Sequence, residues 1–178
     1  AEQYDKLCKN KDTKIHMPKM KTDEETDIVT FTDEQMMILS KYFKGTNAET
    51  AFMLGKYCGL RINECYGLKW SNIDFKHGVI KIDRQMQYQD GIIKLVSLKT
   101  RNARRDIVMA TPLKKYLMKL KKHRDKVAVE LSEQREQNQT FLSDMGKERI
   151  SSLELVNSLD DGKIQTVNSM KYHTQKIK

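Results

Sequence analysis

Apolar residues in the first half of the chain recur at helical spacing. Four of them follow a capping sequence at 32–35, in which a Thr hydroxyl precedes two acids and a glutamine, and Gly45 ends the helix that they predict. The same spacing predicts a second helix over 47–58 and, after Gly59 interrupts it, a short third helix over 60–67. The apolar face of the first helix consists of Met36, Met37, Leu39 and Phe43.

The apolar pattern changes to a period of two near residue 80, which indicates a strand. Alternation over 80–88 predicts a half-buried strand, Asp90-Gly91 is a hairpin turn signal, and 92–98 is the returning strand. After a basic segment, 107–109 predict a third short strand. Three successive strands of this kind predict an antiparallel meander. The alternating apolar residues of the first strand are Ile80, Ile82, Met86 and Tyr88.

Helical spacing returns after Pro112, a residue that suits the first turn of a helix. Apolar residues then recur every three, four or seven positions as far as Leu131, and polar residues over 132–140 predict a loop. A short helix is expected at 151–156 and a final helix from Thr166. Helices, a three-stranded antiparallel sheet and further helices together predict an α+β domain that is mainly helical.

The length of 178 residues fits a single domain, whose first 30 residues differ from the rest. Residues 1–30 are polar and charged, and they predict a linker or arm that leads into a domain over 31–178. No apolar run reaches the roughly 18 residues of a membrane-spanning helix. The three cysteines form no CxxC pair, which argues against a disulfide framework and a structural zinc site. We therefore expect a cytoplasmic protein that binds no metal.

The net charge of +9 is confined to one part of the chain. Residues 1–93 contain 14 basic and 14 acidic residues, 94–126 contain 12 and 2, and 127–178 contain 7 and 8. Basic side chains that bind phosphates release counterions, which gives affinity for nucleic acid of any sequence. The basic window is thus a candidate surface for the DNA backbone, although charge alone also allows a solvated helix face.

Arg61 stands among apolar residues at the start of the third predicted helix, directly after Gly59-Leu60. A guanidinium at this place keeps its proton and offers a planar fork that suits two phosphate oxygens. Glu64, three residues further on, can lie on the same helical face and orient the guanidinium. The alternative is a structural Arg–Glu pair that anchors the turn.

The stretch over 59–74 resembles the first conserved box of the tyrosine recombinases, or phage-type integrases. In that box Gly-Leu-Arg is followed by a Glu and later by a Trp, here Trp70. A capped helix precedes the box, a Lys-Thr follows at the hairpin, and the basic segment at 104–109 is similar to the family's basic strand. The resemblance runs from about Thr30 to the chain end. It implies part of the catalytic domain of a DNA breaking-rejoining enzyme.

This resemblance implies roles for individual residues. Arg61 is similar to the catalytic arginine that grips the scissile phosphate while a tyrosine attacks phosphorus. Lys99 is similar to the hairpin lysine that protonates the departing 5′ oxygen as general acid. The alternative interpretation is that Lys99 is one more surface lysine in a basic loop. Lys94, which lies within the strand, is the rival candidate for the hairpin lysine. Glu64 would organise Arg61 rather than donate a proton.

The family resemblance also implies the partners of this chain. Double-stranded DNA is the expected substrate, and no metal or nucleotide cofactor is needed because a phosphotyrosyl intermediate conserves the bond energy. Contacts to the DNA backbone position a protein without reading bases. The residues expected to make them are Thr100, Arg101, Arg104 and Arg105.

The rest of the family's catalytic set, which is a His-x-x-Arg box, a later His or Trp and the tyrosine nucleophile, has no counterpart in this sequence. None of the four histidines has an arginine three residues on, so a His-x-x-Arg box is missing. Tyr172 lies on the final predicted helix, which in the family precedes that box, and it is a poor candidate for the nucleophile. We therefore expect the front part of a catalytic domain that is inactive alone. The apolar surface that further helices would cover predicts self-association on DNA.

The predicted function is site-specific recombination or integration of a mobile element, either a phage or a transposon. A non-catalytic DNA-binding module or truncated regulator is the first alternative. A helical protein-interaction domain, whose basic segment binds an acidic partner, is the second. Lysine-rich DNA binding alone does not require an arginine at an apolar helix start, so Arg61 favours the enzyme.

Overall fold

The computed structural model describes residues 30–89, 92–98, 103–133, 140–143 and 149–177. The chain divides into one unit over 1–33 and a second unit over 34–178. Lys99, Thr100 and Arg101, all of which carry predicted roles, lie outside the described residues.

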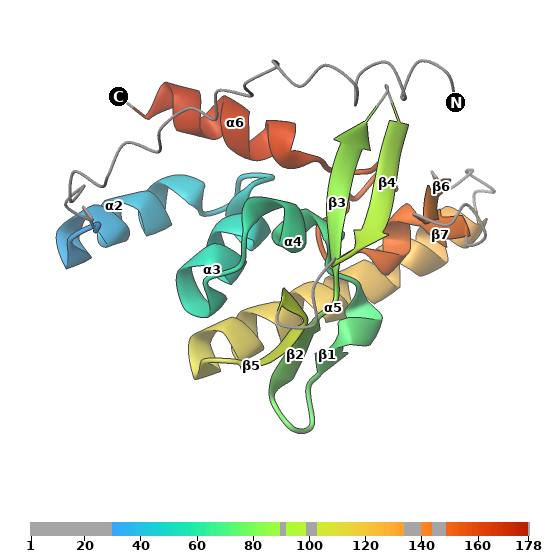
Figure 1. Cartoon of the computed structure of the whole chain (residues 1–178), viewed down its shortest axis with the longest axis horizontal. Helices are drawn as coiled ribbons and strands as arrows, with labels where there is room; N and C mark the ends of the chain where they lie inside the picture. Colours follow the sequence, from blue (N-terminus) through green and yellow to red (C-terminus); the bar gives the residue numbers. More distant parts are fainter. Residues whose placement is uncertain (1–29, 90–91, 99–102, 134–139, 144–148, 178) are drawn as a thin grey trace, which may run out of the picture. The chain divides into compact units, whose positions relative to one another are not determined.

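Five of the six predicted helices are present among the described residues. Gly45 and Gly59 both adopt a positive φ, 76° and 60°, and each follows a helix that it ends. The hydroxyl of Thr166 caps the final helix by accepting a hydrogen bond from the Asn168 N–H at 3.4 Å. The helices of the described residues are α2 (Asp33–Phe43), α3 (Glu49–Cys58), α4 (Ile62–Gly67), α5 (Thr111–Glu133) and α6 (Val167–Lys176) (Figure 1).

Helix α2 buries little of its apolar face. Phe43 is its buried residue and stacks on Phe52 of α3, with ring centroids 4.7 Å apart. Met37 exposes 67% of its surface, as does Ile38. The apolar pattern predicted the helix correctly, but on the predicted face Met37 is exposed and Met36 and Leu39 are only partly buried.

The strands form two separate sheets. The first is antiparallel and has the order β1-β2-β5, and the second has the order β3-β4-β6-β7, in which β4 and β6 run parallel. The α+β class is confirmed, with helices and mainly antiparallel strands. The strands are β1 (Ile73–Asp74), β2 (Val79–Ile82), β3 (Arg84–Gln89), β4 (Ile92–Ser97), β5 (Arg105–Val108), β6 (Thr140–Ser143) and β7 (Arg149–Ser151).

The predicted three-stranded meander is wrong in its pairing. The continuous strand expected over 80–88 is divided at Asp83 into β2 and β3, which belong to different sheets. The Asp83 carbonyl accepts the Leu98 N–H at 2.9 Å, and its carboxylate accepts the Asn72 amide at 3.1 Å. These bonds hold the junction between β2 and β3 to Leu98, which follows β4, and to Asn72, which precedes β1. The third predicted strand, β5, therefore pairs with β2 instead of β4.

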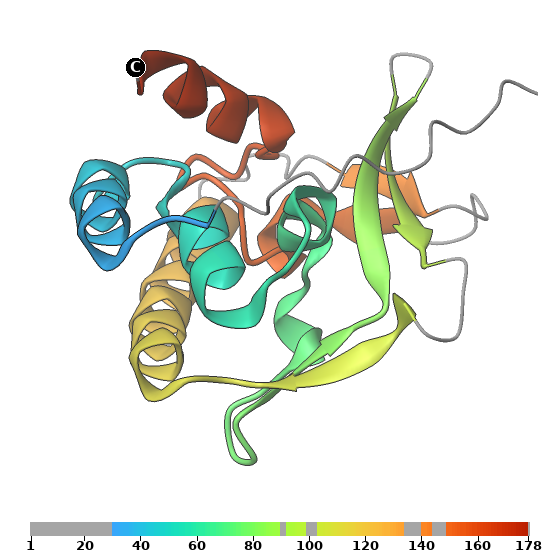
Figure 2. The same ribbon diagram turned by 60° about the vertical axis from the view of Figure 1, so that its left-hand side comes forward.

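Helix α4 lies at the centre of the folded unit. It packs against α3 on one side and β3 on the other, and α3 also contacts α5 (Figure 2). A Cβ atom at Gly67 would lie 2.7 Å from the backbone of Gln85 and Met86. Only glycine allows this approach, which brings the end of α4 against the middle of β3.

The segment that follows β7 is buried although it has little regular structure. The helix predicted over 151–156 is only the 3₁₀ turn η3 (Ser152–Glu154). The Val156 N–H donates to the Leu68 carbonyl at 2.9 Å, and Leu155 is fully buried. Polar side chains that bond the backbone replace the regular ladder here, and a hydrophobic period cannot reveal them.

Candidate active site

A sharp turn between α3 and α4 presents Arg61. Gly59 caps α3 in the left-handed conformation, and its N–H donates to the Gly55 carbonyl at 2.9 Å. Arg61 is then extended, with φ −64° and ψ 148°, and its carbonyl accepts the first hydrogen bond of α4 from the Cys65 N–H. As the residue before the helix, Arg61 points outward, and its side chain is 74% exposed.

The carboxylate of Glu64 is fully buried and lies between two arginines. Its Oε1 accepts from Nη1 of Arg61 at 3.2 Å and from Nη1 of Arg105 at 3.1 Å. Its Oε2 accepts from the Arg61 backbone N–H at 2.9 Å and from Nη2 of Arg105 at 2.8 Å. Each oxygen thus receives one bond from each arginine, which fills the four acceptor sites of the carboxylate.

These contacts decide the charge state of the buried acid. Burial alone raises the pKa of Glu64, but the hydrogen bonds from Arg105 and from the Arg61 N–H, with the charge of Arg105, hold that pKa below its ordinary value. The same bond to Glu64 raises the pKa of Arg105. Glu64 is therefore ionised at neutral pH and cannot serve as a proton donor.

Arg105 is the partner that sequence reasoning assigned to DNA. It opens β5, where its backbone lies opposite the buried Ile82 of β2. Its Nη1 also donates to the Ala103 carbonyl at 3.2 Å, and its side chain is 30% exposed. The structure brings Arg105 to Glu64 from 41 residues away, and no local spacing in the sequence indicates that contact.

The other predicted residues are distributed as follows. Arg104 precedes β5 and is exposed. Lys94 lies inside β4, opposite Gln87 of β3 and Leu142 of β6. Lys99 is outside the described residues, but the residue before it, Leu98, is buried and bonded to Asp83.

Residues from the end of the chain support α4 from behind, and sequence reasoning missed them. The buried amide of Asn157 donates to the Cys65 carbonyl at 2.8 Å. Lys69 forms an ion pair with Glu154 at 2.9 Å. These contacts fix the last turn of the helix that begins beside Arg61.

Tyr66 and Tyr172 represent a buried and an exposed tyrosine of the described residues. Tyr66 of α4 is fully buried, and burial with the nearby Cys65 raises its pKa to about 12. Tyr172 on α6 is 54% exposed and bonds the amine of Lys176. Burial keeps the Tyr66 hydroxyl protonated, which makes it unsuited to nucleophilic attack.

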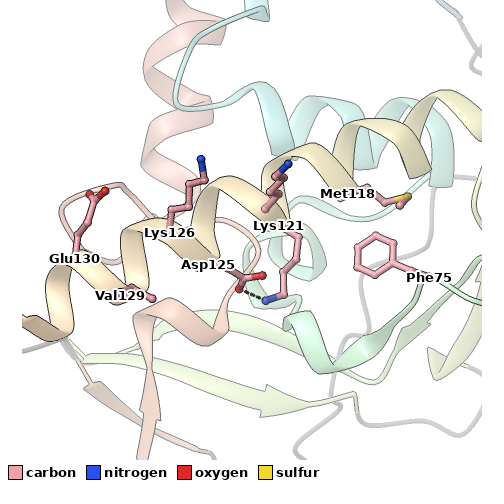
Figure 3. Close-up of a pocket in the computed structure, with 8 residues that line it drawn as sticks. Phe75, Met118, Lys121, Asp125, Lys126, Val129 and Glu130 are labelled. Carbon is pink, nitrogen blue, oxygen red and sulfur yellow. Dashed lines mark hydrogen bonds and ion pairs between the residues drawn. The ribbon is translucent and has the colours of Figure 1, made fainter.

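A separate groove follows the outer side of α5. Figure 3 shows Phe75, Met118 and Val129 on this groove together with the ion pair of Lys121 and Asp125. None of Arg61, Glu64 and Arg105 lines it.

The described part of the chain contains neither a candidate metal cluster nor a candidate membrane span. No group of three or more His, Cys, Asp or Glu side chains within it is arranged to hold a metal ion. No helix among these residues is long and apolar enough to cross a bilayer.

Comparison with known proteins gives concordant matches. The model of the phage integrase family matches residues 18–159. A tyrosine recombinase XerC-like protein of Caldanaerobacter subterraneus subsp. tengcongensis is 30% identical over 145 residues, which cover 76% of this chain and 36% of that protein.

Solved structures of the Tn1549 transposon integrase share the fold. The complex with transposon right end DNA matches with a TM-score of 0.61 and 19% identity, over 88% of this chain and 47% of that one. A complex with a circular intermediate DNA matches with a TM-score of 0.62 and 18% identity, over 87% and 46%. The chain spans less than half the length of each of these relatives.

Proposed function

We propose, since this chain belongs to the phage integrase family, that it supplies part of the active site of a tyrosine recombinase that cuts and rejoins DNA. One observation carries the proposal: Arg61 projects into solvent at the start of α4 while a buried, ionised carboxylate holds it. A surface arginine used only for non-specific DNA binding would not require such support.

Arg61 is the residue that we assign to the scissile phosphate. Its guanidinium bonds Glu64 through Nη1 alone, among the contacts of the described residues, so its remaining N–H groups are directed to solvent. A planar fork can bind two phosphate oxygens and stabilise the charge that develops on them as a tyrosine attacks. Such fixed donors lower the barrier because they need no reorganisation during the reaction.

Lys99 is the residue that we assign to proton transfer. It would donate a proton to the 5′ oxygen as that oxygen leaves phosphorus, so that no alkoxide is released. Its neighbour Leu98 is anchored to Asp83, and Arg105 begins a strand a few residues later. Both flanks of the Lys99 segment are therefore held by the first sheet and its junction.

Double-stranded DNA is the proposed partner. Thr100, Arg101 and Arg104 with the lysines of α5 would contact its backbone, because they belong to the window that carries the whole positive charge. We further propose that the DNA belongs to a mobile element, and that copies of the protein associate on it. The exposed Met37 and Ile38 of α2 are candidates for contact between copies.

These 178 residues alone should not cleave DNA. The sequence contains no His-x-x-Arg, and each family member needs a tyrosine beside such a second arginine to form the covalent intermediate. We therefore assign binding and phosphate activation to this chain, and strand cleavage to a protein that also holds those residues.

The proposal is tested with a protein that contains this chain together with a His-x-x-Arg box and a late tyrosine, and with a nicked duplex substrate that traps the covalent adduct. Wild type should form the adduct, and Arg61→Ala should lower the rate about 100-fold or more while DNA affinity changes little. Arg124 lies on α5 and forms an ion pair with Asp160, and Arg124→Lys is the control that should cleave normally. Absence of DNA binding at low salt would refute the proposal, and loss of folding in Arg61→Ala would favour a structural pair.

A non-catalytic DNA-binding module is the second candidate, and the basic window supports it. In that case Arg61→Ala should weaken DNA binding as much as Arg104→Ala does, and no adduct should form.

A further inference from the structure

We propose that Arg105 is a positioning residue that fixes Arg61 through Glu64, instead of a contact to the DNA backbone. The inference rests on the proposed role of Arg61 at a phosphate. In this role Arg105 keeps the buried carboxylate of Glu64 ionised and correctly oriented, so that this carboxylate holds the exposed Arg61 in place.

The first step concerns the cost of burying Glu64. An ionised carboxylate removed from water is strongly destabilised unless its partners replace the lost hydration. Arg61 is 74% exposed and gives this carboxylate one guanidinium bond at 3.2 Å. Arg105 gives two, at 3.1 and 2.8 Å, in the bidentate geometry that makes such pairs strong. Arg105 is therefore the main counter-charge of Glu64.

The second step concerns which arginine can reach a ligand. Both terminal nitrogens of Arg105 bond Glu64, and Nη1 also bonds the Ala103 carbonyl. Its backbone is held in β5 opposite Ile82, and its side chain is only 30% exposed. The printed bonds use three of the five N–H groups of Arg105 but only one guanidinium N–H of the far more exposed Arg61, so Arg61 is the better placed of the two to bind a phosphate while it keeps its bond to Glu64.

The third step connects the two arginines. Glu64 bonds both the side chain and the backbone N–H of Arg61, so its orientation controls the arginine and the first turn of α4. Because Arg105 occupies one site on each oxygen, it fixes the rotation of the carboxylate. A lysine at 105 would keep the charge but could not occupy both oxygens with a planar fork.

The experiment uses Arg105→Lys and side-chain NMR of the arginine Nε–H groups, with inorganic phosphate as the probe. Arg61→Lys assigns the Arg61 signal in this chain. We expect Arg105→Lys to shift the Arg61 signal and to raise the phosphate concentration at half-saturation roughly tenfold, about the effect of one charge-assisted hydrogen bond. If Arg105 contacted the DNA backbone by its charge alone, Arg105→Lys would keep that contact and would leave the Arg61 signal unchanged.

Arg124→Lys is the matched control, because Arg124 is also mostly buried and pairs with a carboxylate, that of Asp160. It should lower the melting temperature without moving the Arg61 signal, which separates positioning from general stability. If Arg105→Lys does not fold, Glu64→Gln breaks the same link and should shift the Arg61 signal.

The possible outcomes are distinct. An unchanged Arg61 signal and phosphate response in folded Arg105→Lys would overturn the inference and return Arg105 to the DNA backbone. If phosphate does not perturb Arg61 even in wild type, the proposed role of Arg61 fails. A shifted Arg61 signal in Arg105→Lys would still show in that case that Arg105 holds Arg61.

Discussion

Glu64 shows how one buried side chain combines a local and a distant contact. Its spacing from Arg61 is visible in the sequence, and the i to i+3 relation correctly suggests that the two residues meet. The stronger contact, with Arg105, comes from β5 and depends on the pairing of that strand with β2. Local spacing therefore indicates half of this cluster, and the fold supplies the other half.

The first prediction concerns the pH dependence of stability at Glu64. Its pKa in the folded protein lies below the ordinary 4.5, so the unfolded chain takes up this proton first as the pH falls. Glu64→Gln should lower the free energy of unfolding by about 3 kcal/mol at neutral pH, because it leaves two arginines without their buried anion. The stabilisation by the ionised carboxylate is complete above pH 4.5 and is lost as the pH falls through the lowered pKa.

Urea unfolding of wild type and Glu64→Gln from pH 7 to pH 3 measures this difference. The carboxyls of Asp74 and Asp161 also have lowered pKa values, but both proteins contain them and their effects cancel. A difference between the two proteins that stays constant below pH 4.5 would contradict the prediction.

At the scale of elements, the approach of α4 to β3 depends on one missing side chain. Gly67→Ala would place a Cβ atom 2.7 Å from the backbone of β3, where no flexible side chain can move aside. We expect a loss of about 2 kcal/mol in the free energy of unfolding, as for overpacked cores. Denaturant unfolding measures it.

Gly55→Ala is the control for Gly67→Ala. Gly55 lies inside α3, and a Cβ atom there meets nothing within 4 Å. This substitution should stabilise the protein by about 0.5–1 kcal/mol because alanine has the higher helix propensity. Equal effects of the two substitutions would show that α4 can move away from β3 at little cost.

The elements also show what an apolar period can and cannot predict. The helices follow from their apolar spacing together with end signals such as Gly45, Gly59, Pro112 and Thr166. The break at Asp83 was not found, because the buried Ile80, Ile82 and Met86 keep the same alternation across it. Tyr88 continues that alternation but is 72% exposed, so the pattern extended beyond the part of β3 that the core covers.

At the scale of the whole molecule, the positive charge has a measurable consequence. Arg104 is exposed and lies in the basic window, whereas Arg105 is bound to Glu64. If Arg104 contacts a phosphate, Arg104→Gln should make the negative slope of log affinity against log salt shallower by about 0.9. Arg105→Lys should leave that slope unchanged, since it keeps the charge.

Fluorescence anisotropy with a labelled duplex at several salt concentrations gives these slopes. Lys163→Gln, at an ion pair with Asp161 outside the basic window, serves as the control and should not alter the slope. An unchanged slope in Arg104→Gln would remove Arg104 from the DNA contacts.

The bond between Asn157 and the carbonyl of Cys65 joins residues 92 positions apart. During synthesis at about 5–20 residues per second, α4 therefore leaves the ribosome roughly 5–20 seconds before the residue that supports its last turn. Arg105 arrives earlier, 41 residues after Glu64. The ion cluster around Arg61 can thus form while α4 still lacks the residue that supports its last turn. A nascent chain would acquire the charge arrangement of the site first and its rigidity last.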